Sequence, residues 1–165
     1  MSIEIVPGTL RDITYVACNL RPEDSREVFA SARLQSGTEA GAISWATSPG
    51  WCWTAWLKGQ PVAAFGVGLG NPVHQPHIRH AWAYGTDKFK RAAPAITRFC
   101  VLEWPARLIG EGVTRVEIRS IADHDLAHRW LSGLRAHREC DMPNYGVGGE
   151  TFTLWSWRKE DWENE

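Results

Sequence analysis

A basic loop between an expected strand and an expected helix holds the residues of this sequence best suited to bind an anion. A strand that feeds a helix through a short polar loop leaves backbone N–H groups free beside the positive end of the helix dipole. Such a place binds phosphate groups, and cationic side chains add charge of the matching sign. The predicted site comprises Tyr84, Gly85, Thr86, Lys88, Lys90, Arg91, Ala92 and Ala93. The loop has no glycine-rich phosphate motif, which favours the alternative that it is a solvated basic turn.

A second pattern with possible chemistry is a pair of histidines four positions apart. His124 and His128 would share one face of a helix and could both ligate zinc, with Asp125 at the position where metalloproteases carry their Glu base. Asp is one methylene shorter than Glu, and no well-spaced third ligand follows. The same residues also read as a helix N-terminus, with Asp123 as the cap and Asp125 stabilising the dipole. The helix start is the favoured interpretation, and a zinc hydrolase is the weaker one.

Three further histidines, His74, His77 and His80, are spaced three apart. Pro76 argues against a helix over this segment, so a common face for metal binding does not follow from the spacing. We interpret them as polar loop residues and predict no metal site.

Three carboxylates lie on or beside the central elements and are candidates for a general base: Glu103, Glu117 and Asp87. A base must lie near the proton that it removes and must have a pKa close to the working pH. The sequence contains no nucleophile elbow, no complete phosphate-loop motif and no dinucleotide fingerprint, so it offers no other complete catalytic motif.

Composition limits the class of protein. A chain of 165 residues fits one domain, and a net charge of −1 with a pI near 6.6 gives no indication of nucleic acid or of a membrane surface as partner. No apolar run is long enough for a membrane span and no secretion signal is evident. The four cysteines are widely spaced, which favours reduced thiols. The ten tryptophans suit a packed core first and a protein–protein surface second.

The elements that must position these residues follow from periodicity and from turn residues. Strands are expected at Ser2–Val6, Cys52–Lys58, Pro61–Leu69, His80–Tyr84, Val113–Ser120 and Glu150–Trp157. Helices are expected at Leu10–Leu20, Pro22–Ala32 and Ala40–Trp45, from Pro94 to a kink or end near Pro105, and at Asp123–Ala136. Cys140–Gly149 reads as a Gly-rich excursion and Arg158–Glu165 as a charged tail that frays. Strands that meander and then alternate with helices predict an α/β (α+β) domain, with one mixed sheet and helices on both faces.

Several runs resemble known families. The order of elements is similar to that of the GCN5-related N-acetyltransferase (GNAT) superfamily. Within that superfamily, local runs resemble the internal virion protein of short-tailed bacteriophages. These runs are Ala17–Asp24, Gly59–Val67, Trp82–Asp87 and His128–Leu134. The resemblance implies a single GNAT-like domain over residues 1–158, a mixed sheet of about six to seven strands, and a charged tail over residues 159–165.

The resemblance also implies a cofactor site. In acetyltransferases of this fold, a Gln/Arg-x-x-Gly-x-Gly/Ala pattern after the fourth strand holds the pyrophosphate of coenzyme A. The matching run is Arg91–Ile96, where Pro94 stands in place of the first Gly and Ile96 in place of the small residue. Pro removes one N–H donor and Ile restricts the approach of a phosphate, so the loop departs from the pattern. Such enzymes use a Tyr as the acid, and Tyr145 is the only candidate for that role in this sequence. Glu103 and Glu117 are the candidate bases.

The resulting hypotheses differ in class. The first is a phage virion or assembly protein with a degenerate coenzyme loop, which binds other virion proteins and resides in the virion or the host cytoplasm, with the oligomeric state left open. The second is an active acetyl-CoA-dependent N-acyltransferase that acts on an amine. The third is the zinc hydrolase built on His124 and His128.

Overall fold

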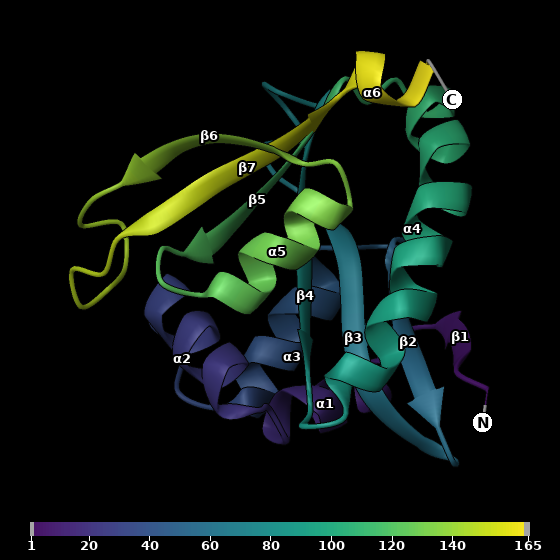
Figure 1. Cartoon of the computed structure of the whole chain (residues 1–165), viewed down its shortest axis with the longest axis vertical. Helices are drawn as coiled ribbons and strands as arrows, with labels where there is room; N and C mark the ends of the chain where they lie inside the picture. The colour runs from purple at the N-terminus through teal and green to yellow at the C-terminus, as the bar shows by residue number, and fades with distance from the viewer. Residues whose placement is uncertain (1, 164–165) are drawn as a thin grey trace.

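The structure is a computed structural model that describes residues 2–163, and its centre is one seven-stranded sheet in the order β1-β2-β3-β4-β5-β7-β6 (Figure 1). The strands are β1 (Glu4–Pro7), β2 (Cys52–Leu57), β3 (Gln60–Leu69), β4 (Ile78–Gly85), β5 (Arg115–Ile121), β6 (His137–Met142) and β7 (Phe152–Arg158). The helices are α1 (Leu10–Cys18), α2 (Pro22–Ser31), α3 (Gly37–Ala46), α4 (Phe89–Gly110), α5 (Asp125–Gly133) and α6 (Lys159–Glu163). The predicted α/β (α+β) architecture with a mixed sheet is confirmed.

One pair of strands differs from all the others. β4 and β5 run parallel, whereas every other neighbouring pair is antiparallel. Their pairing spans three positions and stops at His80 and Glu117. Beyond that point the two strands separate, and Figure 1 shows β5 leaning away from β4 with β7 and β6. The sheet therefore contains a V-shaped gap between the carboxyl-terminal halves of β4 and β5.

Helices cover both faces of the sheet, because β3 and β4 alternate their side chains between two apolar layers. On one face, Ile13 and Val16 of α1 pack with Ala64 and Tyr84. On the other face, Ile96 of α4 packs among the apolar residues of β2 and β3. α4 thus lies over the same strands as α1, on the opposite side.

Aromatic side chains fill the layer beneath α4. Trp53 stacks on Phe65 with ring centroids 5.9 Å apart and contacts Phe99 and Trp104 edge-on or tilted. Trp51 is 5% exposed and meets Trp53 edge-on at 5.7 Å. Such contacts contribute about 0.5–1.5 kcal/mol per pair beyond burial. These tryptophans therefore belong to the core.

Local signals set the first helices as the sequence predicts. Thr9 caps α1, since its Oγ1 accepts a hydrogen bond from the backbone N–H of Asp12 at 3.1 Å and donates to the Asp12 carboxylate at 2.6 Å. Pro22 occupies the first turn of α2, where its missing N–H needs no partner.

Three features differ from the expectations. α4 begins at Phe89 and not at Pro94, because the Phe89 side chain is buried under the first turn. Pro105 does not end the helix, and α4 continues to Gly110. The stretch expected as a Gly-rich excursion begins with the second half of β6, Cys140–Met142, which pairs with β7 at the sheet edge.

The carboxyl-terminal segment also contains regular structure. Lys159–Glu163 forms α6, which packs against α4, and Trp162 contacts the core cluster around Leu108. Residues 164 and 165 of the expected tail lie outside the described residues. Within residues 2–163, no helix combines the length and the apolarity needed to cross a lipid bilayer.

Candidate functional site

The candidate site is the gap between β4 and β5, where strand backbone is left without a strand partner. The N–H of Thr86 donates to the carbonyl of Val62 on β3, so the N–H and C=O of the preceding Gly85 face the gap. By the same alternation, the backbone polar groups of Ala83 also face the gap, beyond the last β4–β5 pair. A gap of this kind can receive an extended ligand that pairs with a strand.

Two carboxylates of α2 enter the gap from one face of the sheet. Asp24 Oδ2 accepts a hydrogen bond from the Gly85 N–H at 2.8 Å. Glu27 Oε2 accepts from the Ile121 N–H at 2.8 Å and from the Ser120 hydroxyl at 2.7 Å. α2 therefore holds the ends of both diverging strands, one with each carboxylate.

Arg21, the N-cap residue of α2, completes this contact. The backbone N–H of Arg21 donates to the Gly85 carbonyl at 2.9 Å, and its guanidinium lies 2.8 Å from Asp24 Oδ1 and 4.4 Å from the centre of the Phe89 ring. His124 Nε2 lies 3.4 Å from the same Asp24 oxygen. Asp24 is 6% exposed, so its charge is balanced inside the protein by these two groups.

Burial and pairing shift the protonation of this cluster. The pKa of Glu27 is raised because burial disfavours its charged form, although the hydrogen bonds from Ser120 and Ile121 oppose the shift. The pKa of His124 is raised, first by its hydrogen bond with Asp24. Both shifts favour the protonated forms, so this part of the gap holds protons more tightly than isolated side chains would.

The backbone N–H groups of the predicted anion loop donate to acceptors within the chain itself. The N–H of Thr86 donates to Val62, that of Lys88 to Thr86 Oγ1 at 3.3 Å, that of Phe89 to the Thr86 carbonyl and that of Arg91 to the Lys88 carbonyl. A phosphate nest requires several free N–H groups that point to one place. Most donors of this loop are already used.

On the other face of the sheet, Trp130 crosses between the two helices that flank the gap. Its Nε1 donates to Thr97 Oγ1 of α4 at 2.8 Å, and its ring meets Phe89 edge-on at 5.4 Å. A cavity of about 180 Å³ remains on this face, and one of about 240 Å³ lies on the α1–α3 face. Both are lined by Glu27, Ala83 and Ile118, so they meet at the gap.

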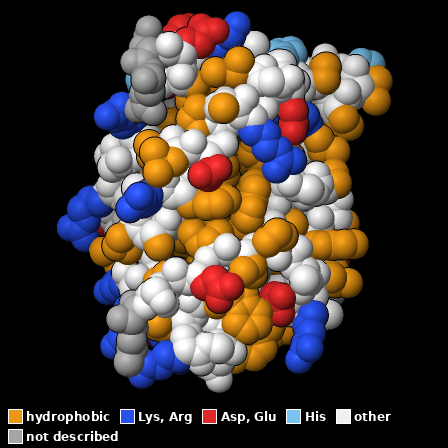
Figure 2. Space-filling model, turned by 90° about the vertical axis from the view of Figure 1, so that its right-hand side faces the viewer, with side chains coloured by type: hydrophobic (Ala, Val, Ile, Leu, Met, Phe, Trp, Pro, Cys, Tyr) orange, Lys and Arg blue, Asp and Glu red, His pale blue; other side chains and the backbone are white. Residues whose placement is uncertain are grey.

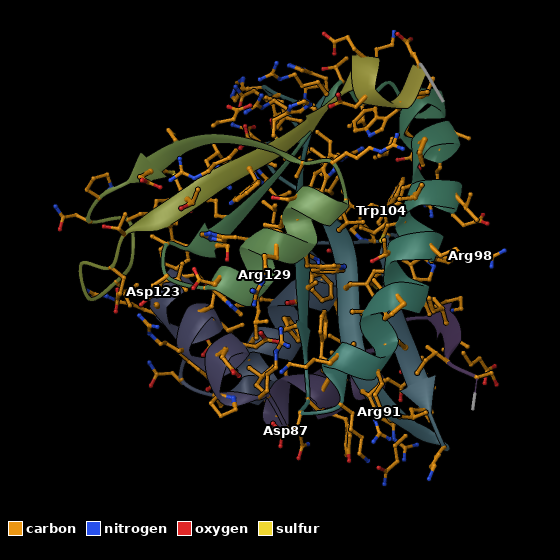
Figure 3. All side chains as sticks on the ribbon, in the orientation of Figure 1. Asp87, Arg91, Arg98, Trp104, Asp123 and Arg129 are labelled. Carbon is orange, nitrogen blue, oxygen red and sulfur yellow. The ribbon has the colours of Figure 1, made fainter. Side chains whose placement is uncertain are left out.

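The residues predicted to hold a phosphate gather around the end of β4 but have different surroundings. Lys90 and Ala93 line the cavity on the α4 face. Tyr84 is 4% exposed and packs on the opposite face, and Ala92 is fully buried in the core. The others lie at the turn: Gly85, Thr86, Lys88 and Arg91, with Arg91 and Asp87 near the start of α4 in Figure 3. Gly85 is required there, because a Cβ would lie 2.5 Å from the Phe89 ring.

The structure brings two of the three candidate catalytic residues near each other and leaves Glu103 apart. Glu103 is exposed on α4. Glu117 is 14% exposed and forms ion pairs with Arg115 at 2.7 Å and Arg119 at 2.9 Å. Tyr145 lies in the β6–β7 loop, with its ring 5.8 Å from the Arg119 guanidinium. Glu117 and Tyr145 are thus linked through Arg119 at the edge of the α1–α3 face cavity, which Arg119 also lines.

The two histidines of the zinc hypothesis have different roles. His124 caps α5 by accepting at Nδ1 from the Ala127 N–H, and its Nε2 faces Asp24. His128 packs against Trp155, with centroids 5.3 Å apart. Within residues 2–163, no three His, Cys, Asp or Glu side chains are placed to hold a metal ion.

Comparison with solved structures identifies the fold, whereas no protein-family model and no curated protein matches the chain. A protein assigned as an acetyltransferase superposes with a TM-score of 0.71 at 17% identity, over 98% of this chain and 86% of the other. The GNAT-family acetyltransferase of Streptococcus pneumoniae gives 0.65 at 12% identity, over 95% and 99%. The yncA protein of Salmonella typhimurium, solved with its cofactor acetyl-CoA, gives 0.69 at 11%, over 96% and 95%. The chain therefore has the fold of GNAT acetyltransferases.

The residues around the gap do not fit a coenzyme well. The amides of the loop after β4 and of the strand ends are bound by the chain itself, Trp130 spans the two flanking helices, and Pro94 lies inside α4. Asp24 and Glu27 also place two carboxyl groups in the gap, and the Arg21 guanidinium beside them is paired with Asp24. The contacts that remain for a coenzyme arm include the backbone of Ala83 and the side chains of Lys90 and Arg21, which line the cavity on the α4 face.

Sequence reasoning missed the α2 cluster. The N-cap Arg21 and the α2 residues Asp24 and Glu27 are spaced three apart, so they fall close to one side of the helix, and this spacing was a usable signal. Their partners Gly85, Ser120 and Ile121 are 61 to 94 positions away, and no local pattern predicts such pairs.

Proposed function

We propose that this chain is a bacteriophage virion or assembly protein that uses a GNAT fold without coenzyme chemistry. The observation that carries the proposal is that the carboxylates of Asp24 and Glu27 accept the backbone N–H groups of Gly85 and Ile121 at the gap. The resemblance of four runs to the internal virion protein of short-tailed phages supports the phage assignment.

A surface for assembly supports the same proposal. Figure 2 views the side on which α4, β1 and β2 lie, and hydrophobic side chains form a hollowed strip down its middle. Ile3, Ile5, Trp53 and Phe99 are only partly buried at the edge of the core, and Leu102 of α4 is 60% exposed. Apolar surface rimmed by charged groups is typical of protein interaction sites. Another virion protein, or a second copy of the chain, is the expected partner.

Two measurements test this function. The chain is expected in gradient-purified particles of the phage that encodes it, at a fixed copy number by quantitative mass spectrometry, and its absence from those particles would refute the virion role. Calorimetry with acetyl-CoA is expected to give no binding heat, and no rise of the melting temperature, because a ligand that binds the native state must raise it.

An active acyl-CoA-dependent N-acyltransferase is the second candidate. It is favoured by the two cavities that meet at Ala83 from opposite faces of the sheet, since a donor on one side could then reach an acceptor amine on the other. The presence of acetyl-CoA in the yncA structure supports it by analogy of fold. Micromolar binding of acetyl-CoA to the purified chain would favour this candidate over the first.

A further inference from the structure

The carboxylate of Glu27 lies in the gap without an ion-pair partner among residues 2–163. Its Oε2 accepts from two neutral donors of β5, a serine hydroxyl and a backbone N–H. The neighbouring Asp24 differs, because Arg21 and His124 lie 2.8 and 3.4 Å from its Oδ1 and balance its charge. An anion withdrawn from water without a paired cation is unfavourable, and the raised pKa of Glu27 has the same cause. A cation supplied by a ligand would therefore stabilise the charged form of Glu27.

The second oxygen of this carboxylate is open to a ligand. Glu27 Oε1 has no hydrogen-bond partner among the described residues, and it is not one of the polar atoms that the protein seals from solvent. Glu27 also lines the cavities on both faces of the sheet, which meet at the gap. On the α4 face, the cations Arg21 and Lys90 line the cavity, and the carboxylate of Asp24 opposes them. The cavity on the α1–α3 face is therefore the more favourable route for a cation to Oε1.

The cavity on the α1–α3 face suits the apolar body of a small cation. Its volume is about 240 Å³, below the range of about 300–1,000 Å³ typical of drug-sized ligands, so it fits a compact molecule. Leu34, Ile43 and Ile118 give it aliphatic walls. Trp82 gives it an aromatic wall, and its ring stacks on Tyr84 with centroids 5.1 Å apart, which holds the indole in place. An indole face attracts a cation that lies beside it.

Arg119 is the other charged residue of this lining, and its charge is already matched. Its Nη2 donates to Glu117 Oε2 at 2.9 Å, and its Nη1 lies 2.9 Å from His80 Nδ1. The lining thus leaves the negative charge of Glu27 unmatched.

We propose that the cavity on the α1–α3 face binds a compact monoamine with an apolar body, whose ammonium donates to Glu27 Oε1 and lies against Trp82. As an acceptor site for acylation, it rests on the second candidate function and names the class of amine. The binding itself requires no acyl donor, so it is measured without one.

Two ligands that differ in one group test the proposal. 2-Phenylethylamine carries an ammonium, and 2-phenylethanol has the same ring and chain with a hydroxyl. Calorimetry at neutral pH, without acetyl-CoA, is expected to show 1:1 binding of the amine about tenfold tighter than the alcohol, as expected for a charge-assisted hydrogen bond.

Glu27→Gln separates the charge from the shape of the side chain. It keeps an acceptor for the strand end and presents an amide NH₂ group to the cavity, so it should abolish the preference for the amine. Glu23→Gln removes an exposed carboxylate of the same helix and should preserve that preference. A preference that survives in Glu27→Gln would overturn the assignment of the acceptor.

Two further readouts locate the site. Ala32→Leu adds bulk at an exposed position that lines the cavity and should weaken both ligands about tenfold. Ala46→Leu adds the same side chain at an exposed position of α3 outside the lining and should leave both affinities unchanged. Equal effects of the two substitutions would contradict this location.

The side-chain carboxyl ¹³C resonance of Glu27 gives a test in the unaltered protein. It should move with the amine and not with the alcohol. An unmoved resonance, or no binding of the amine, would refute this inference and would leave the binding of acetyl-CoA to decide between the two candidate functions.

Discussion

Glu27 offers the sharpest test of the contact between α2 and the diverging strands. Replacing it by Ala removes the acceptor for the Ile121 N–H and for the Ser120 hydroxyl, two residues that are 3% and 2% exposed. A buried donor left without a partner costs about 1–3 kcal/mol, while the hydroxyl can rotate and recover part of its loss. Removing the carboxylate also removes the cost of burying it, which offsets part of this loss of stability. We therefore expect Glu27→Ala to lower the free energy of unfolding by about 2 kcal/mol.

Glu27→Gln separates the hydrogen bonds from the charge, because it keeps an oxygen acceptor. The folded pKa of Glu27 is raised above its ordinary value of 4.5 by burial. A raised carboxyl pKa means that the folded state binds the proton more tightly, so stability decreases as pH rises from 4.5 to the folded pKa and then levels off. The Gln variant lacks this contribution, and its stability relative to the native protein should increase over the same interval.

Urea denaturation at pH values from 4 to 8 measures both effects. Glu23→Ala is the matched control, since Glu23 is an exposed carboxylate in the first turn of the same helix. Glu23→Ala should lower the free energy of unfolding by less than about 1 kcal/mol. If Glu27→Ala costs no more than the control, or if the native and Gln profiles stay parallel across the pH range, the reasoning about the gap is wrong.

Three other perturbations follow from the structure. Asp24→Asn should lower the pKa of His124 in an NMR titration, because the hydrogen bond with Asp24 is the first cause of the raised pKa. The stability that His124 contributes through this bond is complete below the unfolded-state pKa of His124 and is lost as pH rises through its folded-state pKa. The pKa of Glu139 is lowered to about 2 by its ion pair, so its stabilisation should disappear as pH falls from 4.5 toward 2, and Glu139→Gln should flatten an acid-unfolding curve over that range. Gly66→Ala should destabilise by about 1–3 kcal/mol in thermal melts, because the added Cβ would lie 2.4 Å from the Trp51 carbonyl oxygen; an unchanged melting temperature would contradict the packing of β3.

Local patterns were sufficient for most of the elements. Thr9 and Pro22 mark helix starts by hydrogen bonding and by backbone restriction, both of which act within one turn. The apolar residues of β3 and the alternation of β5 predict strands, and turn residues separate them. The mixed sheet of the GNAT fold follows from this order of elements, together with the resemblance to known families.

Tertiary contacts decided the rest. β6 is a charged edge strand, exposed at nearly every position, so it has no apolar alternation and forms because β7 provides its hydrogen bonds. α4 begins at Phe89 because that ring is buried beside Gly85, and local propensity favours the later Pro94.

The character of the gap likewise depends on the folded chain. The sequence by itself placed a basic loop after β4, but the loop amides donate to Val62 and to their own turn. The carboxylates that hold the strand ends come from α2, far away in the chain. Backbone N–H groups can bind an anion only if no acceptor of the chain already bonds to them, and the folded structure determines which acceptors lie close enough.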